Sequence, residues 1–132
     1  MCSAVAYLHE RNIVHHDLKP GNILIFGDSV KIGDFGISRD LASKNYIETN
    51  KVRGTVNYIA PEIWNGEPYN ARSDVWALGC ILFELCTLQL AFPGEVAQVY
   101  GKIMNGKFDP IPAHLPYSDR VRCIVDLLIQ KD

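Results

Sequence analysis

The sequence predicts a mainly α-helical fold with one short β-hairpin. Residues 75–90 form a long apolar stretch, and residues 121–128 carry apolar side chains at helical spacing, so both segments are expected to be helices. Two runs rich in β-branched residues, 23–25 and 30–32, are separated by a turn at Gly27-Asp28, which predicts two antiparallel strands. Helices therefore make up most of the predicted structure.

Length and charge are those of a single globular unit. The chain has 132 residues and a formal net charge of -2, and this length allows a sizeable hydrophobic core. A charge so close to neutral gives no support for nucleic acid or an anionic membrane surface as a partner. The sequence shows no internal repeat. The oligomeric state is left open.

The cysteines and the apolar segments bear on the cellular location of the protein. The four cysteines form no Cys-x-x-Cys pair, so we expect free thiols in a reducing compartment. The residues after Met1 lack the basic flank and long apolar run of a signal peptide. The apolar segment 75–90 contains Glu84 and is short for a membrane span. We therefore expect a cytoplasmic protein, with cytoskeletal or nuclear association left open.

The first 53 residues alternate regular and irregular segments. Residues 2–10 are expected to form a helix, and because no N-cap precedes it, the chain is expected to begin inside an element. Ile13 and Val14 lead into the polar run 15–22. Residues 39–53 are polar without helical or strand periodicity, which predicts a long loop of the kind that often carries function.

The segment from Ser73 onward is expected to hold the centre of the fold. Ser73 is a suitable N-cap for a helix over 74–88. This helix is apolar on nearly every side, which is typical of a buried element. Core positions are expected on it for three large side chains and two thiols, namely Trp76, Phe83, Leu85, Cys80 and Cys86.

Two further helices are predicted after this centre. A surface helix over 96–105 should end at Gly106. Pro110, Pro112 and Pro116 interrupt the chain next. Ser118 is then expected to cap a last helix, which has no terminating signal before Asp132, so the chain is also expected to be cut at this end.

The run His15-His16-Asp17-Leu18-Lys19-Pro20-Gly21-Asn22 carries the candidate chemistry. Phosphoryl transfer needs a carboxylate to orient the attacking hydroxyl, an ammonium to neutralise the moving phosphate, and an amide that helps to hold magnesium. Asp17, Lys19 and Asn22 supply these groups within six residues. Asp34 follows the predicted hairpin, between a strand and a Phe-Gly pair, and a carboxylate there can be directed at a metal ion.

Four motifs in this order resemble the C-terminal lobe of a eukaryotic protein kinase. They are the run 15–22, Asp-Phe-Gly at 34–36, Ala-Pro-Glu at 60–62 and Asp-Val-Trp-Ala-Leu-Gly at 74–79. The resemblance covers essentially the whole chain, so residues 1–132 are expected to be a partial kinase domain. Lys19 together with Thr55 resembles the serine/threonine branch, and segments 31–39, 68–70, 73–80 and 84–88 look like NIMA-related kinases.

The resemblance implies a role for each site residue. Asp17 matches the catalytic base, Lys19 the lysine that contacts phosphate, and Thr55 the threonine that bonds near both. Asn22 and Asp34 match the magnesium ligands. The implied reaction transfers the γ-phosphoryl group of ATP, with Mg²⁺, to a serine or threonine of a protein substrate.

Other positions match binding and structural residues of the family. Leu24 matches the apolar floor beneath adenine. His15 and Phe35 match a packed column that accompanies the active arrangement. Asp74 matches a buried carboxylate that holds the backbone of the catalytic loop. Glu62 matches a structural acid whose arginine partner lies in a later stretch than these 132 residues.

The chain departs from the kinase pattern in two ways. The 132 residues contain no glycine-rich phosphate loop, no strand lysine and no helix glutamate, so the N-terminal lobe is absent from the expected fold and this fragment alone is expected to be inactive. His16 replaces an arginine that grips phosphate, and Lys51 stands where a phosphorylated threonine is often found. We therefore expect an activation loop that is not ordered by that phosphate, with Thr49 and Tyr46 as alternative phosphosites.

Two alternatives stay open. The chain is compatible with a pseudokinase or fragment that binds partners through the surface after Phe92. It is also compatible with a truncated gene product that has no function. A metal cluster at 15–17 has little support, because adjacent side chains diverge and no second ligand cluster lies at a matching spacing.

Overall fold

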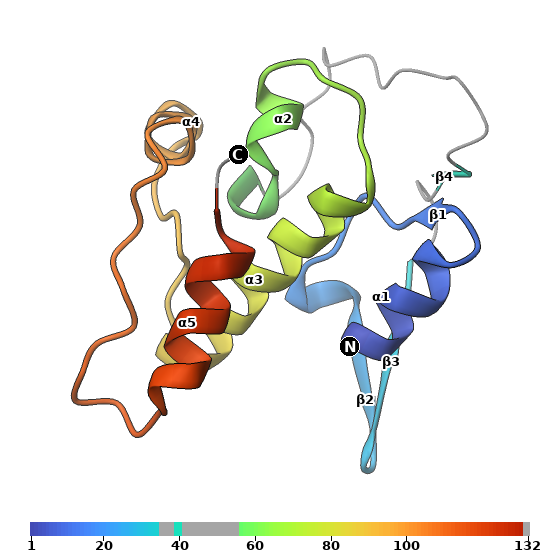
Figure 1. Ribbon diagram of the computed structural model, residues 1–132, viewed down its shortest axis with the longest axis horizontal. Helices are drawn as coiled ribbons and strands as arrows, with labels where there is room; N and C mark the ends of the chain where they lie inside the picture. The colour runs from blue at the N-terminus through green and yellow to red at the C-terminus, as the bar shows by residue number, and fades with distance from the viewer. Residues whose placement is uncertain (35–38, 41–55, 131–132) are drawn as a thin grey trace.

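The computed structural model describes residues 1–34, 39–40 and 56–130 (Figure 1). In chain order its helices are α1 (Cys2–His9), η1 (Pro20–Asn22), η2 (Val56–Tyr58), α2 (Pro61–Trp64), α3 (Ala71–Thr87), α4 (Val96–Met104) and α5 (Asp119–Leu128). Its strands are β1 (Ile13–Val14), β2 (Ile23–Phe26), β3 (Ser29–Ile32) and β4 (Arg39–Asp40). The mainly helical fold with a short hairpin is therefore confirmed.

Helix α3 is the central element, and the other helices lie around it (Figure 1). It begins earlier than expected. Asn70, not Ser73, is the N-cap, because the Asn70 side chain accepts a hydrogen bond from the backbone N–H of Arg72 at 2.7 Å. Ser73 completes a capping box by accepting from the N–H of Asn70 at 3.3 Å. The helix ends at Leu88, whose positive φ of 57° is a left-handed C-cap.

The core forms mainly where α3 packs against α5 and η2. Trp76, Phe83 and both thiols of α3 are buried, as predicted. Leu85 was expected in the core, and this is wrong, because the side chain is 59% exposed on the side of α3 that no described element covers. On α5, Val125 is fully buried but Ile124 is 47% exposed, since a helix turns only one stripe toward its neighbour.

Strands β2 and β3 pair antiparallel, with Ile23 opposite Ile32 and Phe26 opposite Ser29. Gly27 has a φ of +53° in the tight turn between them, a conformation that glycine adopts without strain. The hairpin extends away from the helices (Figure 1), and most of its side chains are exposed. The predicted hairpin is confirmed.

A second pairing was not predicted. Residues 39–53 were expected to be a loop, but Arg39 and Asp40 form β4, which pairs antiparallel with β1 through Val14 opposite Arg39 and Ile13 opposite Asp40. Two residues are too few to show the alternation that marks a strand in sequence. Residues 41–53 of the expected loop lie outside the described ranges.

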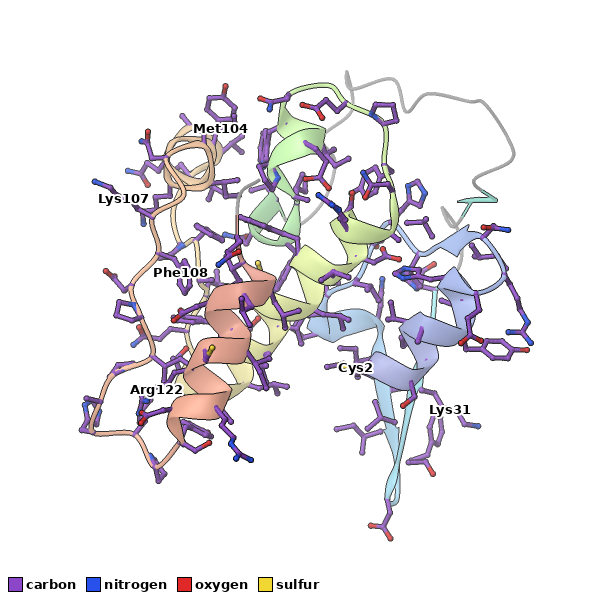
Figure 2. All side chains as sticks on the ribbon, in the orientation of Figure 1. Cys2, Lys31, Met104, Lys107, Phe108 and Arg122 are labelled. Carbon is purple, nitrogen blue, oxygen red and sulfur yellow. The ribbon has the colours of Figure 1, made fainter. Side chains whose placement is uncertain are left out.

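Helices α4 and α5 confirm the predictions for the second half of the chain. Ser118 occupies the N-cap position of α5 but makes no side-chain capping hydrogen bond. Arg122 on α5 lies beside the connection that follows α4 (Figure 2), and its guanidinium group donates to the Leu115 carbonyl at 3.0 Å. Within the described ranges, we find no helix with the length and apolar character that crossing a membrane requires.

Candidate functional site

Three predicted site residues come together at Asp17. The Lys19 Nζ donates to Asp17 Oδ2 at 2.6 Å, and the Asn22 Nδ2 donates to the same oxygen at 3.0 Å. Asn22 Nδ2 also donates to the backbone oxygen of Asp17 at 2.7 Å. The Asp17 carboxylate is about one-third exposed, so it is both oriented by its neighbours and open to a substrate.

Local structure explains how six residues bring these groups together. Pro20 occupies the first turn of η1, where its missing N–H is not needed, and the N–H of Asn22 donates to the Lys19 carbonyl at 3.0 Å. The turn folds Asn22 back over Asp17. The Asn22 carbonyl then accepts from the N–H of Gly33 at 2.8 Å, which extends the hairpin register by one pair, up to the residue before Asp34.

A buried carboxylate fixes the backbone that precedes Asp17. Asp74, on the first turn of α3, is only 1% exposed. Its Oδ2 accepts from the N–H of His15 at 2.9 Å, and its Oδ1 accepts from the N–H of His16 at 3.1 Å. These contacts confirm the expected structural role of Asp74. Hydrogen bonds to a buried charged acceptor contribute about 1.5–3 kcal/mol each, so the 15–22 segment is firmly tied to α3.

The ring of His15 links the segment to the hairpin. His15 is fully buried, and its Nε2 donates to the Gly33 carbonyl at 3.1 Å. The N–H of Asp17 donates to His15 Nδ1 at 3.3 Å. Because Nδ1 accepts and Nε2 donates, these partners assign the neutral tautomer with the proton on Nε2. His15 thus supports the residue before Asp34 and the backbone of Asp17 at once.

Two residues at the site were not predicted from sequence. His9, at the end of α1, places its Nε2 2.9 Å from Asp74 Oδ2. Tyr69 stacks on the ring of His16, with ring centroids 4.2 Å apart and planes 27° apart, and its hydroxyl donates to the His16 carbonyl at 3.1 Å. His9 had a weak signal as a polar residue six positions before the motif, whereas Tyr69 is 53 residues from its partner and was noted only within the 68–70 segment that resembles NIMA-related kinases.

The donors near Asp17 suit a magnesium ion. Asn22 and Asp34 offer an amide oxygen and a carboxylate, and Mg²⁺ binds one or two such protein ligands together with water and phosphate oxygens. The Nδ2 of Asn22 is engaged with Asp17, so its Oδ1 is the atom left to face a cation. Among the described residues no cluster of three His, Cys, Asp or Glu side chains has metal-binding geometry.

Other predicted positions are placed only in part. Leu24, on β2, is 46% exposed and is available to an apolar ligand face. Asp34 has a φ of 58°, in the left-handed region that is uncommon for a residue other than glycine. The positions predicted for a phosphate contact, a packed column and loop regulation lie outside the described residues, and they are Thr55, Phe35, Tyr46, Thr49 and Lys51.

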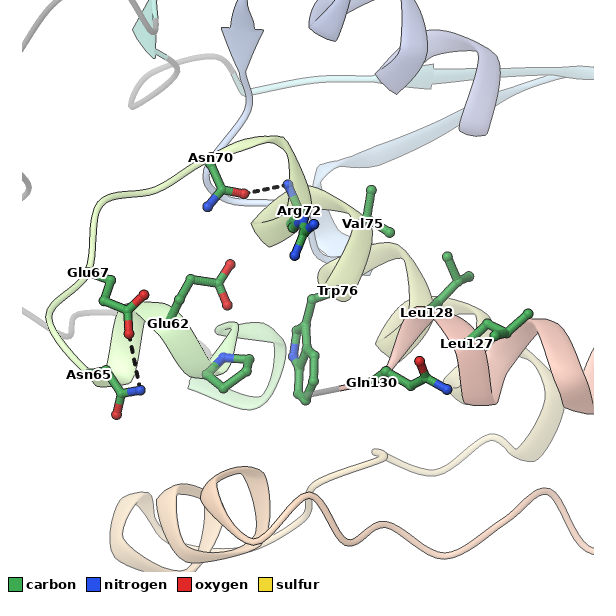
Figure 3. Close-up of a pocket in the computed structure, with 11 residues that line it drawn as sticks. Glu62, Asn65, Glu67, Asn70, Arg72, Val75, Trp76, Leu127, Leu128 and Gln130 are labelled. Atoms are coloured by element: carbon green, nitrogen blue, oxygen red, sulfur yellow. Dashed lines mark hydrogen bonds between the residues drawn. The ribbon is translucent and has the colours of Figure 1, made fainter. Parts of the chain in front are cut away.

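A pocket of about 290 Å³ lies away from Asp17, between α2, the start of α3 and the end of α5 (Figure 3). Glu62 lines it, and this carboxylate accepts from the Ser73 hydroxyl at 2.6 Å. The indole of Trp76 also faces the pocket, and its buried Nε1 has no hydrogen-bond acceptor among the described residues. None of the residues predicted to act on phosphate lines this pocket.

Comparison with known proteins places the chain in a family. A sequence model of the family described as "Protein kinase domain" matches residues 1–131. The chain is 44% identical to the zebrafish serine/threonine-protein kinase Nek8 over 98% of its length, and 43% identical to nekl-2 of Caenorhabditis elegans over 96%. It is 41% identical to mouse Nek1 over its full length.

The relatives are much longer proteins. The chain spans 18% of Nek8, 35% of nekl-2 and 11% of Nek1. The aligned region nevertheless includes the helices, the hairpin and the 15–22 segment, because almost the whole chain is aligned in each case. The chain therefore belongs to the protein kinase family, and its similarity is to the Nek serine/threonine kinases.

Proposed function

We propose that the protein is a serine/threonine kinase and that residues 1–132 are the C-terminal lobe of its catalytic domain. The observation that carries the proposal is the Asp17 carboxylate, held by Lys19 at 2.6 Å and Asn22 at 3.0 Å. Phosphoryl transfer depends mainly on positioning and charge stabilisation, and this cluster provides both. The free state of all four cysteines supports a cytoplasmic location.

Each residue of the cluster has a defined part in the proposed reaction. Asp17 orients the hydroxyl of a protein serine or threonine and accepts its proton. Lys19 neutralises charge on the transferring group. Thr55, which lies outside the described residues, has its proposed role near both side chains only from the family resemblance. Asn22 and Asp34 hold Mg²⁺, while Leu24 contacts the adenine of ATP. The bound magnesium ion supplies positive charge to the phosphate oxygens.

These 132 residues alone are expected to transfer little phosphate. The sequence contains no glycine-rich loop or strand lysine to clamp the phosphates of ATP. The hairpin beside the site also exposes large apolar side chains, namely Leu24, Ile25, Phe26 and Val30. Such a surface is typical of an interface with another part of the same domain.

The test is an Asp17→Asn substitution in the natural full-length protein. Transfer of phosphate from ATP to a protein or peptide substrate should fall at least about 100-fold, the contribution of a general base. The matched control is Asp109→Asn, because Asp109 is exposed and lies outside the site. Equal transfer rates in the Asp17→Asn protein and the wild type would show that the chain does not act through this carboxylate.

A second candidate function is a protein-binding module, and the exposed face of α4 favours it. Val96 is 51% exposed and Tyr100 is 44% exposed on this helix. Tyr100 packs edge-on against Trp64 of α2, with ring centroids 5.5 Å apart, so the aromatic surface is rigid. A binding role of this kind predicts that Asp17→Asn changes nothing, whereas a Tyr100→Ser change abolishes partner binding.

A further inference from the structure

Tyr69 is tied to the 15–22 segment by two different contacts. Its ring stacks on the His16 ring, with centroids 4.2 Å apart. Its hydroxyl donates to the His16 carbonyl at 3.1 Å. A stacked aromatic pair and a partly buried hydrogen bond each resist movement in a different direction, because one fixes the side chain and the other fixes the backbone.

His16 is the residue through which such a contact reaches Asp17. Its N–H donates to Asp74 Oδ1 at 3.1 Å, and its carbonyl accepts from Tyr69. Its φ is +73°, a left-handed conformation that a residue with a side chain adopts only when its surroundings hold it. The next peptide begins at this carbonyl and leads directly to Asp17. Release of the carbonyl therefore reorients the peptide that carries the Asp17 carboxylate.

The space around the stacked pair is small. A cavity of only about 20 Å³ lies beside it, lined by both rings together with Asp17, Asp74 and Tyr58. This volume admits about one water molecule and no phosphate group. Burial raises the pKa of Tyr69, and the nearby carboxylates of Asp74, Asp17 and Glu62 raise it further. The hydroxyl thus stays protonated, and able to donate, across the physiological pH range.

We propose that Tyr69 is a positioning residue that sets Asp17 through His16 and does so without a phosphate group. The proposal rests on the proposed kinase function, because it assigns the regulation of that same site. The contact is built from an aromatic ring and a hydroxyl of Tyr69, so the contact itself needs no modification of the chain. Its effect passes along the His16 backbone.

The test separates the ring from the hydroxyl. Tyr69→Phe keeps the stack and removes the donor, whereas Tyr69→Leu removes both. The matched control is Tyr7→Leu, since Tyr7 lies on α1, is 56% exposed and has its ring beneath the Arg11 guanidinium group. All three are made in the natural full-length protein and compared with the wild type.

The first measurement is amide hydrogen exchange, which needs no activity. The N–H of Asp17 is bonded to His15, and the N–H of His16 to Asp74, so both are protected in the folded chain. We expect exchange at these two amides to rise about 5-fold in Tyr69→Phe, the equivalent of one hydrogen bond, and about 30-fold in Tyr69→Leu, while α3 and α5 keep their protection. Equal exchange at both amides in the wild type and Tyr69→Leu overturns the proposal, as does an equal rise throughout the fold.

The second measurement is the kinetics of phosphate transfer. A positioning role predicts that kcat falls by about the same factors while KM for ATP and peptide stays unchanged. If a Tyr69 variant loses exchange protection at the Asp17 amide but keeps the wild-type kcat, Tyr69 does not position Asp17 for catalysis, and the proposal is overturned. If wild type and Asp17→Asn are equally inactive, the kinase function has failed, and exchange at the Asp17 amide still decides whether Tyr69 positions this residue.

Discussion

The side chains of His9 and Asp74 meet at 2.9 Å between Nε2 and Oδ2, although 65 residues separate them in the sequence. His9 is the last residue of α1, and Asp74 lies in the first turn of α3. The same carboxylate accepts the backbone N–H groups of His15 and His16. One buried charge therefore connects the end of a helix, the central helix and the segment that carries the candidate catalytic base.

The first prediction concerns this carboxylate. Asp74→Asn replaces one acceptor oxygen with an NH₂ group, which faces an N–H donor or the His9 ring instead of accepting from it. A buried donor without an acceptor costs about 1–3 kcal/mol, and hydrogen bonds to a charged group are lost as well. We expect the free energy of unfolding to fall by about 3 kcal/mol, measured by urea denaturation.

Asp126→Asn is the matched control, because Asp126 is an exposed acid on α5. Its unfolding free energy should stay within about 0.5 kcal/mol of the wild type, as for most surface substitutions. A loss no larger in Asp74→Asn than in this control would mean that the His9, His15 and His16 contacts do not stabilise the fold.

The second prediction concerns the contact between α3 and α5. A Cβ atom added at Gly79 of α3 would lie 2.7 Å from the Cβ of Leu128 and 2.8 Å from Cγ1 of Ile129. Gly79→Ala should therefore lower the free energy of unfolding by about 1–3 kcal/mol through overpacking. Gly101→Ala on α4 is the control, because nothing lies within 4 Å of the added Cβ there.

These two variants should change stability in opposite directions. Alanine is favoured over glycine inside a helix by about 1 kcal/mol, so Gly101→Ala is expected to raise the midpoint of thermal unfolding while Gly79→Ala lowers it. A midpoint that rises in both proteins would show that α5 moves away from α3 without cost.

Sequence patterns predicted the helices and strands better than they predicted how these elements pack against one another. The helix around Trp76 and the hairpin at Gly27 follow from hydrophobic periodicity and turn chemistry, which act over a few residues. Ser73 and Asn70 are both good capping residues, and the two positions between them are compatible with either start. The exposure of Leu85 depends on which elements lie beside α3, and that is a property of tertiary packing.

The candidate site was predicted where its residues are close in sequence. Asp17, Lys19 and Asn22 lie within six residues, so their types and spacing were sufficient to place them together. The contacts of Tyr69 with His16 and of His9 with Asp74 join segments 53 and 65 residues apart. No local pattern encodes such pairs, since helices of the same sequence could pack in other registers.

The third prediction concerns cysteine reactivity. Cys2 and Cys123 are exposed, whereas Cys80 and Cys86 are buried on α3. Burial raises the pKa of the Cys80 and Cys86 thiols, although the charge of Arg122 partly lowers that of Cys86. Because the thiolate is the nucleophile, iodoacetamide at pH 8 should alkylate the two exposed cysteines first. Mass spectrometry of peptides after short exposure measures the order.

The raised pKa of Cys80 also predicts how the free energy of unfolding changes at alkaline pH. An unfolded cysteine thiol ionises near pH 8.5, whereas the raised pKa keeps buried Cys80 neutral in the folded chain. Above about pH 8.5 the unfolded state therefore binds fewer protons than the folded state, and the free energy of unfolding falls as pH rises. Cys80→Ser should flatten this alkaline slope, whereas Cys123→Ser should leave it unchanged; identical slopes in all three proteins contradict the assignment.

The last prediction concerns the connection between α4 and α5. The guanidinium group of Arg122 donates to the carbonyls of Pro112 and Leu115, each at 3.0 Å, and of Tyr117 at 3.4 Å, and it also contacts the Ile111 carbonyl. One side chain thus satisfies several backbone acceptors in a proline-rich segment that has few partners of its own. The planar fork of donors in arginine makes this possible.

A lysine at position 122 keeps the positive charge but replaces the branched guanidinium with a single ammonium group. It therefore cannot donate at the same time to carbonyls as far apart as those of Pro112 and Tyr117. We expect Arg122→Lys to lower the free energy of unfolding by about 1–3 kcal/mol and to speed backbone hydrogen exchange in residues 111–118. Arg120→Lys is the control, because Arg120 is exposed on the same helix. If Arg122→Lys matches this control in both measurements, charge and not the fork of donors holds the connection.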